Sequence, residues 1–275
     1  MASYDRTFAI WDPITKKCIL AVSGYFGTVI SDSIAWLQDM SQFALGSDQA
    51  FSAMIFDSVT GECILTLKGH NGNVDSVAWS YNGSRLASGS YDGIISRIWD
   101  PAISQRTSTL EGHKDQIHLI AWSRDRAKVA SVTQHYDTTV TIWNPATGQC
   151  ISTLKGHNGF VESVTWSHDG SRLASGCSDG TIGIWNPTTG QCISIFEGHS
   201  RTIDSMIWSP YGGRIASRSD RDQAAKIWNP ATGQCESTLD INSCKFCEFD
   251  KVTVDSSTIE TPDPTSTTSR CIASR

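Results

Sequence analysis

The chain has 275 residues, of which 39% are apolar and 18% charged, and its formal net charge is −6. This composition is too apolar for a disordered chain, and the length suits one large all-β domain or two ordinary domains. A negative chain has no positive field to gather phosphates, which argues against nucleic acid as the main ligand. With neither a leader pattern nor an apolar run of about 18 residues, we expect a soluble, cytoplasmic protein without direct membrane insertion.

Markers at regular intervals organise the chain from its first strand onward. An aromatic residue recurs every 42 to 45 residues in one series, a first-strand tryptophan every 42 to 44 in a second, and a Gly-His pair at matching intervals in a third. The members are Trp11, Phe56, Trp99, Trp143, Trp185 and Trp228; Trp36, Trp79, Trp122, Trp166 and Trp208; and His70, His113, His157 and His199. Three series in step indicate an internal repeat of about 43 residues.

Each repeat unit predicts four short strands. In one unit, Val74 to Trp79 is rich in β-formers, residues 81–84 form a turn signal, residues 86–88 resume a strand, and residues 91–93 turn again toward Trp99. No segment carries a helical apolar period of useful length. The chain is therefore predicted to be all-β.

The Gly-His, Ser, Asp and Trp-Asp positions of these units resemble the WD40 repeat of β-propellers. Gly69-His70, Ser88, Asp92 and Trp99-Asp100 carry the resemblance in one unit, and it extends over residues 1 to about 240. It implies five complete four-stranded blades, at residues 28–67, 73–110, 116–154, 160–196 and 202–239.

The two ends of the chain leave the blade number open. Residues 3–11 supply the second half of a blade, and the tail, aligned through Cys244 and Cys247, supplies a first strand. The termini then form either a composite blade that closes a six-bladed ring or parts of a truncated seven-bladed ring. We expect the propeller over residues 1–260 and a disordered Ser/Thr/Pro-rich tail over residues 261–275.

The near-identical phrases at residues 144–157 and 229–239 are similar to the C-terminal WD40 domains of fungal NACHT-type signalling proteins. In that family the repeats bind or sense a partner, and a separate nucleotide-binding domain performs the switching. This resemblance implies a longer chain or complex that contains such a domain. No phosphate-binding Gly-x-x-x-x-Gly-Lys-Ser/Thr loop occurs in the sequence itself.

By resemblance, the recurrent polar residues form structural tetrads of His, Ser, Asp and Trp. A hydrolase triad needs one singular arrangement in a cleft, whereas this set recurs in successive blades. The predicted tetrads are His70, Ser88, Asp92 and Trp99; His113, Ser131, Asp137 and Trp143; His157, Ser175, Asp179 and Trp185; and His199, Ser217, Asp222 and Trp228. In blade 28–67 Tyr25 and Phe56 replace the His and the Trp, so no tetrad forms there and we expect the softest complete blade.

The cysteines follow the repeat as well. Five of the nine lie seven residues after the anchor aromatic, at Cys18, Cys63, Cys150, Cys192 and Cys235. A catalytic cysteine would not be copied five times, and a large chain without an export signal favours free thiols. Cys244 and Cys247 resemble half a zinc site, but no second pair follows. We expect no metal and no cofactor.

Three positions in each unit fall near the rim of the central channel in the WD40 family. Carboxylates there accept forked bonds from Arg, and aromatic faces attract cations. The predicted partner-binding residues are Asp32, Asp75, His118, Glu162, Asp204, Asn73, Tyr91, Gln116, Tyr136, Phe160 and Thr202. They favour a protein or peptide partner of basic character, although acidic rim residues also serve solubility alone.

The sequence therefore favours a non-catalytic interaction scaffold or sensor that binds a basic peptide segment. One alternative is an adaptor of a membrane-remodelling complex, because the WD40 propellers of fungal mitochondrial-fission adaptors resemble this chain. Another is a propeller hydrolase, for which His118 is the one unusual candidate on the channel axis.

Overall fold

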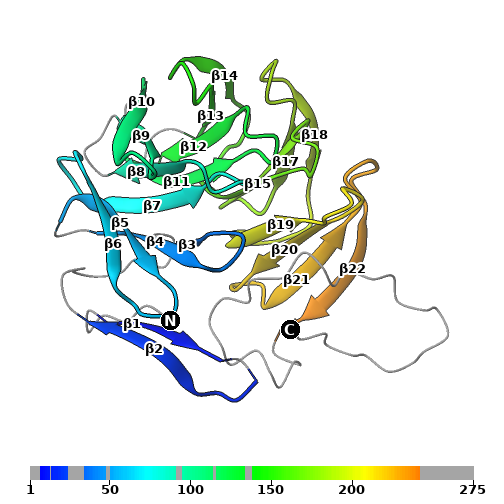
Figure 1. Cartoon of the computed structure of the whole chain (residues 1–275). Coiled ribbons are helices and arrows are strands. Elements are labelled where there is room, and N and C mark those ends of the chain that lie inside the picture. The colour runs from blue at the N-terminus through cyan, green and yellow to red at the C-terminus, as the bar shows by residue number, and fades with distance from the viewer. Residues whose placement is uncertain are drawn as a thin grey trace. The chain divides into compact units, whose positions relative to one another are not determined.

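The fold consists of short antiparallel strands joined by tight turns (Figure 1). The computed structural model describes residues 7–12, 14–23, 34–47, 50–90, 95–113, 116–133 and 138–241. Within these ranges every regular element is a strand, so none of the described residues forms a helix that could cross a membrane. The all-β prediction is confirmed.

Five four-stranded sheets and one two-stranded sheet contain all the strands of the described residues. Each sheet runs in simple chain order, and all pairings are antiparallel. The sheets are β1 (Thr7–Trp11) and β2 (Cys18–Ser23); β3 (Ile34–Trp36), β4 (Gln42–Gly46), β5 (Ser52–Asp57) and β6 (Cys63–Lys68); β7 (Val74–Trp79), β8 (Leu86–Ser90), β9 (Ile95–Asp100) and β10 (Gln105–Glu111); β11 (Ile117–Trp122), β12 (Val129–Thr133), β13 (Val140–Trp143) and β14 (Cys150–Leu154); β15 (Val161–Trp166), β16 (Leu173–Cys177), β17 (Ile182–Trp185) and β18 (Cys192–Phe196); β19 (Ser205–Trp208), β20 (Ile215–Ser219), β21 (Ala224–Trp228) and β22 (Cys235–Asp240).

The five predicted complete blades correspond to the five four-stranded sheets. Near the N-terminus, β1 pairs with β2, and Trp11 lies opposite Cys18 as Phe56 lies opposite Cys63, so this pair matches the third and fourth strands of a blade. The tail, with Cys244, Cys247 and residues 261–275, lies outside the described residues, as do Tyr25 and Asp32.

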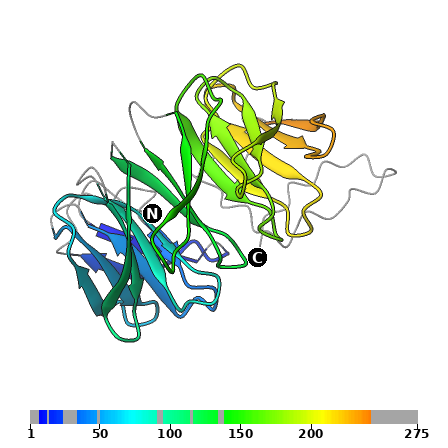
Figure 2. The same ribbon diagram turned by 90° about the horizontal axis from the view of Figure 1, so that it is seen from above.

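The chain falls into two compact units, Met1–Gly156 with Pro187–Gln191, and His157–Asn186 with Cys192–Arg275. Within unit 1, the β3–β6 and β7–β10 sheets share an apolar cluster that includes Val74, Val77 and Trp99. Within unit 2, Ile182, Ile203 and Trp228 belong to a cluster that joins the β15–β18 and β19–β22 sheets. Figure 2 shows these two sheets, in yellow-green and in yellow to orange, beside each other. Neighbouring sheets in each unit are thus held face to face by buried apolar side chains.

A glycine near the end of the second strand allows neighbouring sheets to approach closely. Gly46, Gly89 and Gly176 hold the same position in β4, β8 and β16. A Cβ on Gly46 would lie 2.1 Å from the carbonyl oxygen of Val74, the first residue of β7. The absence of a side chain at Gly46 lets the backbones of two sheets meet.

The β3–β6 sheet replaces the hydrogen-bonded tetrad with an aromatic stack. Phe43 stacks on Phe56 with 5.2 Å between the ring centroids, and Trp36 lies 5.2 Å from Phe43. Leu45, fully buried, occupies the strand position that Ser88 has in the next sheet. Apolar groups therefore replace both the hydroxyl and the indole at once, which leaves no polar atom of that pair stranded.

Candidate functional site

Four sheets contain the same buried trio of His, Ser and Trp side chains. In the β7–β10 sheet, Ser88 Oγ lies 2.7 Å from His70 Nε2 and 2.8 Å from Trp99 Nε1. The trios His113, Ser131 and Trp143; His157, Ser175 and Trp185; and His199, Ser217 and Trp228 have the same bonds. These contacts tie the loop before each first strand to the second and third strands.

The fourth member of the tetrad, the Asp, engages its histidine in two different ways. Asp222 Oδ2 lies 3.1 Å from His199 Nδ1, so this carboxylate bonds the ring directly. Asp179 instead accepts a 2.6 Å bond from Thr181, whose hydroxyl lies 3.2 Å from His157 Nδ1. Asp92 and Asp137 lie outside the described residues.

The bonds around His157 form a chain with one consistent direction. Trp185 Nε1 donates to Ser175 Oγ, and the Ser175 hydroxyl donates to His157 Nε2. The proton on His157 Nδ1 is then donated to Thr181 Oγ1, whose own hydroxyl donates to Asp179. This order places the proton of a neutral imidazole on Nδ1 and uses each donor once.

The His and Ser of these trios are poorly suited to nucleophilic catalysis. The side chains of Ser88, Ser131 and Ser175 are fully buried, and Ser217 is nearly so. Each hydroxyl is already held by an imidazole and by an indole. A nucleophile needs access to substrate, so these groups act as a brace that recurs from sheet to sheet.

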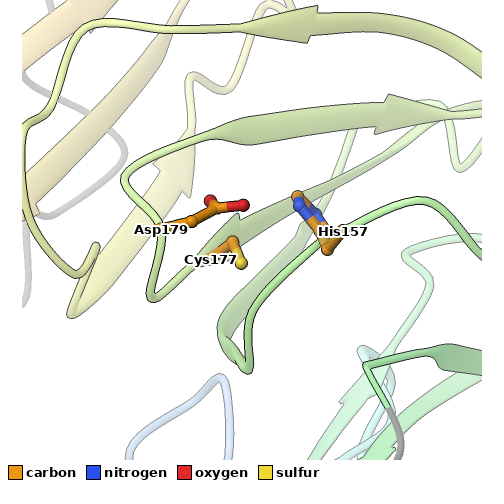
Figure 3. A group of neighbouring side chains, drawn as sticks. All are labelled: His157, Cys177 and Asp179. Carbon is orange, nitrogen blue, oxygen red and sulfur yellow. The ribbon is translucent and has the colours of Figure 1, made fainter.

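Cys177 lies beside one brace and is the one described cysteine outside the series of exposed cysteines (Figure 3). Its sulfur, a His157 ring nitrogen and an Asp179 oxygen lie within 4.8 Å of one another, and Zn²⁺ accepts such donors. Hydroxyl groups already engage both His157 nitrogens, and burial raises the pKa of the Cys177 thiol to about 11. The expectation of no metal stays a prediction. The sequence analysis missed this cluster. The available signal was that Cys177 ends its second strand where Ser90 and Ser219 end theirs.

The buried histidines make stability pH-dependent. Burial lowers the pKa of His157 and of His199 below the ordinary 6.5, although nearby carboxylates act to raise both. The unfolded chain binds more protons below that pH, so the stabilisation is complete above 6.5 and is lost as the pH falls through 6.5 toward the lowered values. We expect a lower melting temperature at about pH 5.5 than at about pH 7.5. Equal melting temperatures would contradict neutral, buried imidazoles.

The rim of unit 2 brings several predicted binding residues together. The Phe160 N–H donates to Ser178 Oγ at 2.9 Å, and the Ser178 N–H donates to the Phe160 carbonyl at 2.8 Å. The Thr202 hydroxyl donates to the Ser178 carbonyl at 3.4 Å. The loops before β15 and β19 are thus joined through the turn after β16, and the Phe160 side chain remains 43% exposed.

Two carboxylates extend this rim. Asp204 is exposed, and its Oδ2 accepts the Asp220 N–H at 2.7 Å. Glu162, in β15, is half-buried. Asp220 also pairs with Arg218 at 2.5 Å, which offsets one charge. We call Phe160, Glu162, Ser178, Thr202 and Asp204 the unit 2 rim.

The corresponding positions of unit 1 that the structure describes expose less charge. Asp75 is only 7% exposed, so its carboxylate offers little surface to a partner, and its role in binding stays a prediction. Asn73, Gln116 and His118 are half-buried. Tyr91 and Tyr136, like Asp32, fall outside the described residues.

The periodic cysteines lie where the repeat predicts. Each is the first residue of a fourth strand, is exposed and has no disulfide: Cys18, Cys63, Cys150, Cys192 and Cys235. Each thiol donates to the backbone carbonyl two residues later. Arg106 takes the matching place in β10.

A family model described as "WD domain, G-beta repeat" matches residues 61–100, 104–144, 148–186 and 190–229, more than half of the chain. Each match begins just before the fourth strand of one sheet and ends at or just after the third strand of the next sheet. The sequence repeat is therefore offset from the sheet by one strand. No curated protein matches the chain.

Proposed function

The chain belongs to the WD40-repeat family, and on that premise we propose that it is a non-catalytic interaction module whose unit 2 rim binds a basic peptide segment. Its antiparallel four-stranded sheets are the blades of a WD40 β-propeller. Such repeats commonly serve as scaffolds for protein partners. We infer the chemical class of the partner, a basic peptide, from the side chains of the unit 2 rim.

The observation that carries the proposal is the joined rim with its exposed ring. Hydrogen bonds between the loops fix Phe160, Ser178 and Thr202 without the ring having to be buried. An exposed aromatic face attracts Lys or Arg side chains, and a loop backbone already held by hydrogen bonds loses little further entropy when a peptide binds. Glu162 and Asp204 supply carboxylates for the same cations.

Cationic side chains on these loops limit where a basic peptide can bind. Arg218 is paired with Asp220, so most of its field is offset. Arg201 and Arg221 are exposed on the loops that carry Thr202 and Asp220. The peptide cation therefore binds next to Phe160 and Glu162 rather than over the Arg201 side.

The resemblance to fungal NACHT-type signalling proteins supports a role as the sensing part of a larger assembly. In such an assembly the module contributes recognition and a separate nucleotide-binding domain contributes switching. The adaptor and hydrolase alternatives gain no support from the geometry of the described residues. For hydrolysis in particular, His118 is only half-exposed and Ser175 is fully buried.

The test is a calorimetric titration of the chain with a Lys/Arg-rich peptide. The double variant Glu162→Gln and Asp204→Asn keeps size and hydrogen-bonding shape but removes two charges, and we expect about tenfold weaker binding. Arg201→Gln is the matched control, because it removes a like charge from the same rim and should not weaken binding. If the double variant binds as tightly as the parent chain, the unit 2 rim is not the site.

A further inference from the structure

A hollow in unit 1 has a different chemistry from the rim. It measures about 410 Å³ and lies between the β7–β8 turn, the β11–β12 turn and the turn after β13. Arg85, Arg126, Asn82, Asn144 and Trp122 are among its lining residues, which include no Asp and no Glu. It lies at the opposite end of β7 from Asn73 and Asp75.

Arg126 adopts an unusual backbone conformation to reach this place. Its φ is +63°, in the left-handed region that favours glycine. Three other sheets have glycine at the same turn position, Gly83, Gly170 and Gly212, with φ between +67° and +74°. In the β3–β6 sheet Met40, with φ +60°, holds this position, so two sheets accept a non-glycine residue here, and only Arg126 of the two is cationic.

Among the described residues, neither arginine in the hollow has a charge partner. Within the part of the chain that the structure describes, the guanidinium groups of Arg85 and Arg126 make no ion pair and no hydrogen bond. By contrast, Arg214, at the repeat position of Arg85, pairs with Glu236 at 2.7 Å. Two unpaired guanidinium groups in one hollow leave their donors open to a ligand.

The asparagines in the lining add further donors. The Asn82 Oδ1 already accepts bonds from the hydroxyls of Ser80 and Ser84, and the Asn144 Oδ1 accepts the N–H groups of Ala146 and Thr147. These bonds leave the amide Nδ2 groups, which only donate, for a ligand. Both asparagines thus have their amide oxygens engaged and their amide N–H groups available to a ligand in the hollow.

We propose that this hollow is an oxyanion-binding site for a phosphate or carboxylate group on an acidic peptide segment. The forked guanidinium groups of Arg85 and Arg126 match the paired oxygens of either group, and the asparagine amides complete the donor set. The site is independent of the unit 2 rim, because it shares no residue with it and takes ligands of the opposite charge.

The experiment compares three peptides of one sequence, with phosphoserine, glutamate or serine at the central position, titrated into the full chain. We expect the phosphoserine peptide, the glutamate peptide or both to bind more tightly than the serine peptide. The stronger of the two anionic peptides identifies the source of the oxyanion.

Arg126→Gly is the decisive variant, because it restores the residue that three other sheets carry. It should weaken binding of the anionic peptide by about tenfold to a hundredfold while the melting temperature stays equal or rises. Arg85→Gln should weaken it similarly, and Arg172→Gln, at the matching position of β15–β16, should not. Equal binding of all three peptides, or unchanged binding by both Arg126→Gly and Arg85→Gln, would overturn the proposal.

Discussion

Ser175→Ala is expected to lower the free energy of unfolding by about 2–6 kcal/mol, because it strands two buried polar groups at about 1–3 kcal/mol each. Ser175 is fully buried, and its hydroxyl holds both His157 Nε2 and Trp185 Nε1. With alanine in its place, the indole N–H has no acceptor and the imidazole nitrogen has no donor. Urea denaturation of the two proteins measures the difference.

A second substitution separates lost hydrogen bonds from lost packing. Phenylalanine has no N–H, so adding Trp185→Phe to Ser175→Ala should cost less than the sum of the two single changes. The β3–β6 sheet supplies the precedent, because Leu45 and Phe56 occupy the same two positions there. Strict additivity, or a loss for Ser175→Ala below about 1 kcal/mol, would contradict the brace.

Gly46→Ala is the second change with a large expected effect, a loss of about 3 kcal/mol or more. The new Cβ would lie 2.1 Å from the Val74 carbonyl oxygen, a contact that only movement of backbone can relieve. That carbonyl belongs to the first residue of β7, whose N–H donates to Ser47 at 3.2 Å. Separating the two sheets would also open the apolar cluster between them.

Gly89→Ala is the matched comparison, because Gly89 has the same repeat position. Its Cβ would meet side-chain atoms of Ile117 and Ile120, the nearest at 2.7 Å, and a small shift of these side chains relieves the contact without moving backbone apart. We expect a smaller loss, of about 1–2 kcal/mol. If both variants unfold at the same urea concentration, the backbone contact at Gly46 is not what holds these sheets together.

The periodic features were predictable from the sequence because the same residue types recur at the same positions of successive repeat units. The strand pattern around Trp79 and Trp99 and the fourth-strand positions of Cys63 and Cys150 follow from a position's recurrence in successive units. The pairing of His70 with Ser88 was instead implied by the resemblance to the WD40 repeat, and the structure contains the bond between them. When several copies agree at a position, that position can be recognised before the fold is known. The same logic explains why the missing tetrad around Phe56 could be recognised.

Features that occur in one copy only were not predictable. Spacing placed Asp75 near the rim, but the burial of its side chain depends on neighbouring side chains that spacing does not specify. The position of the Thr181 hydroxyl between His157 and Asp179 depends on side-chain rotamers. Such features depend on contacts in three dimensions. Each occurs in one repeat unit, so comparing the units with one another does not reveal it.

Titration of the chain with peptides that differ only in charge tests the proposed function most directly. The peptides share one length and one aromatic content, and carry Lys/Arg, neutral or Glu residues. We predict that the basic peptide binds more tightly than the neutral one, that added salt weakens this binding, and that Arg126→Gly leaves it unchanged. A basic peptide that binds no better than the neutral peptide at low salt would contradict the acidic, aromatic rim as the recognition surface.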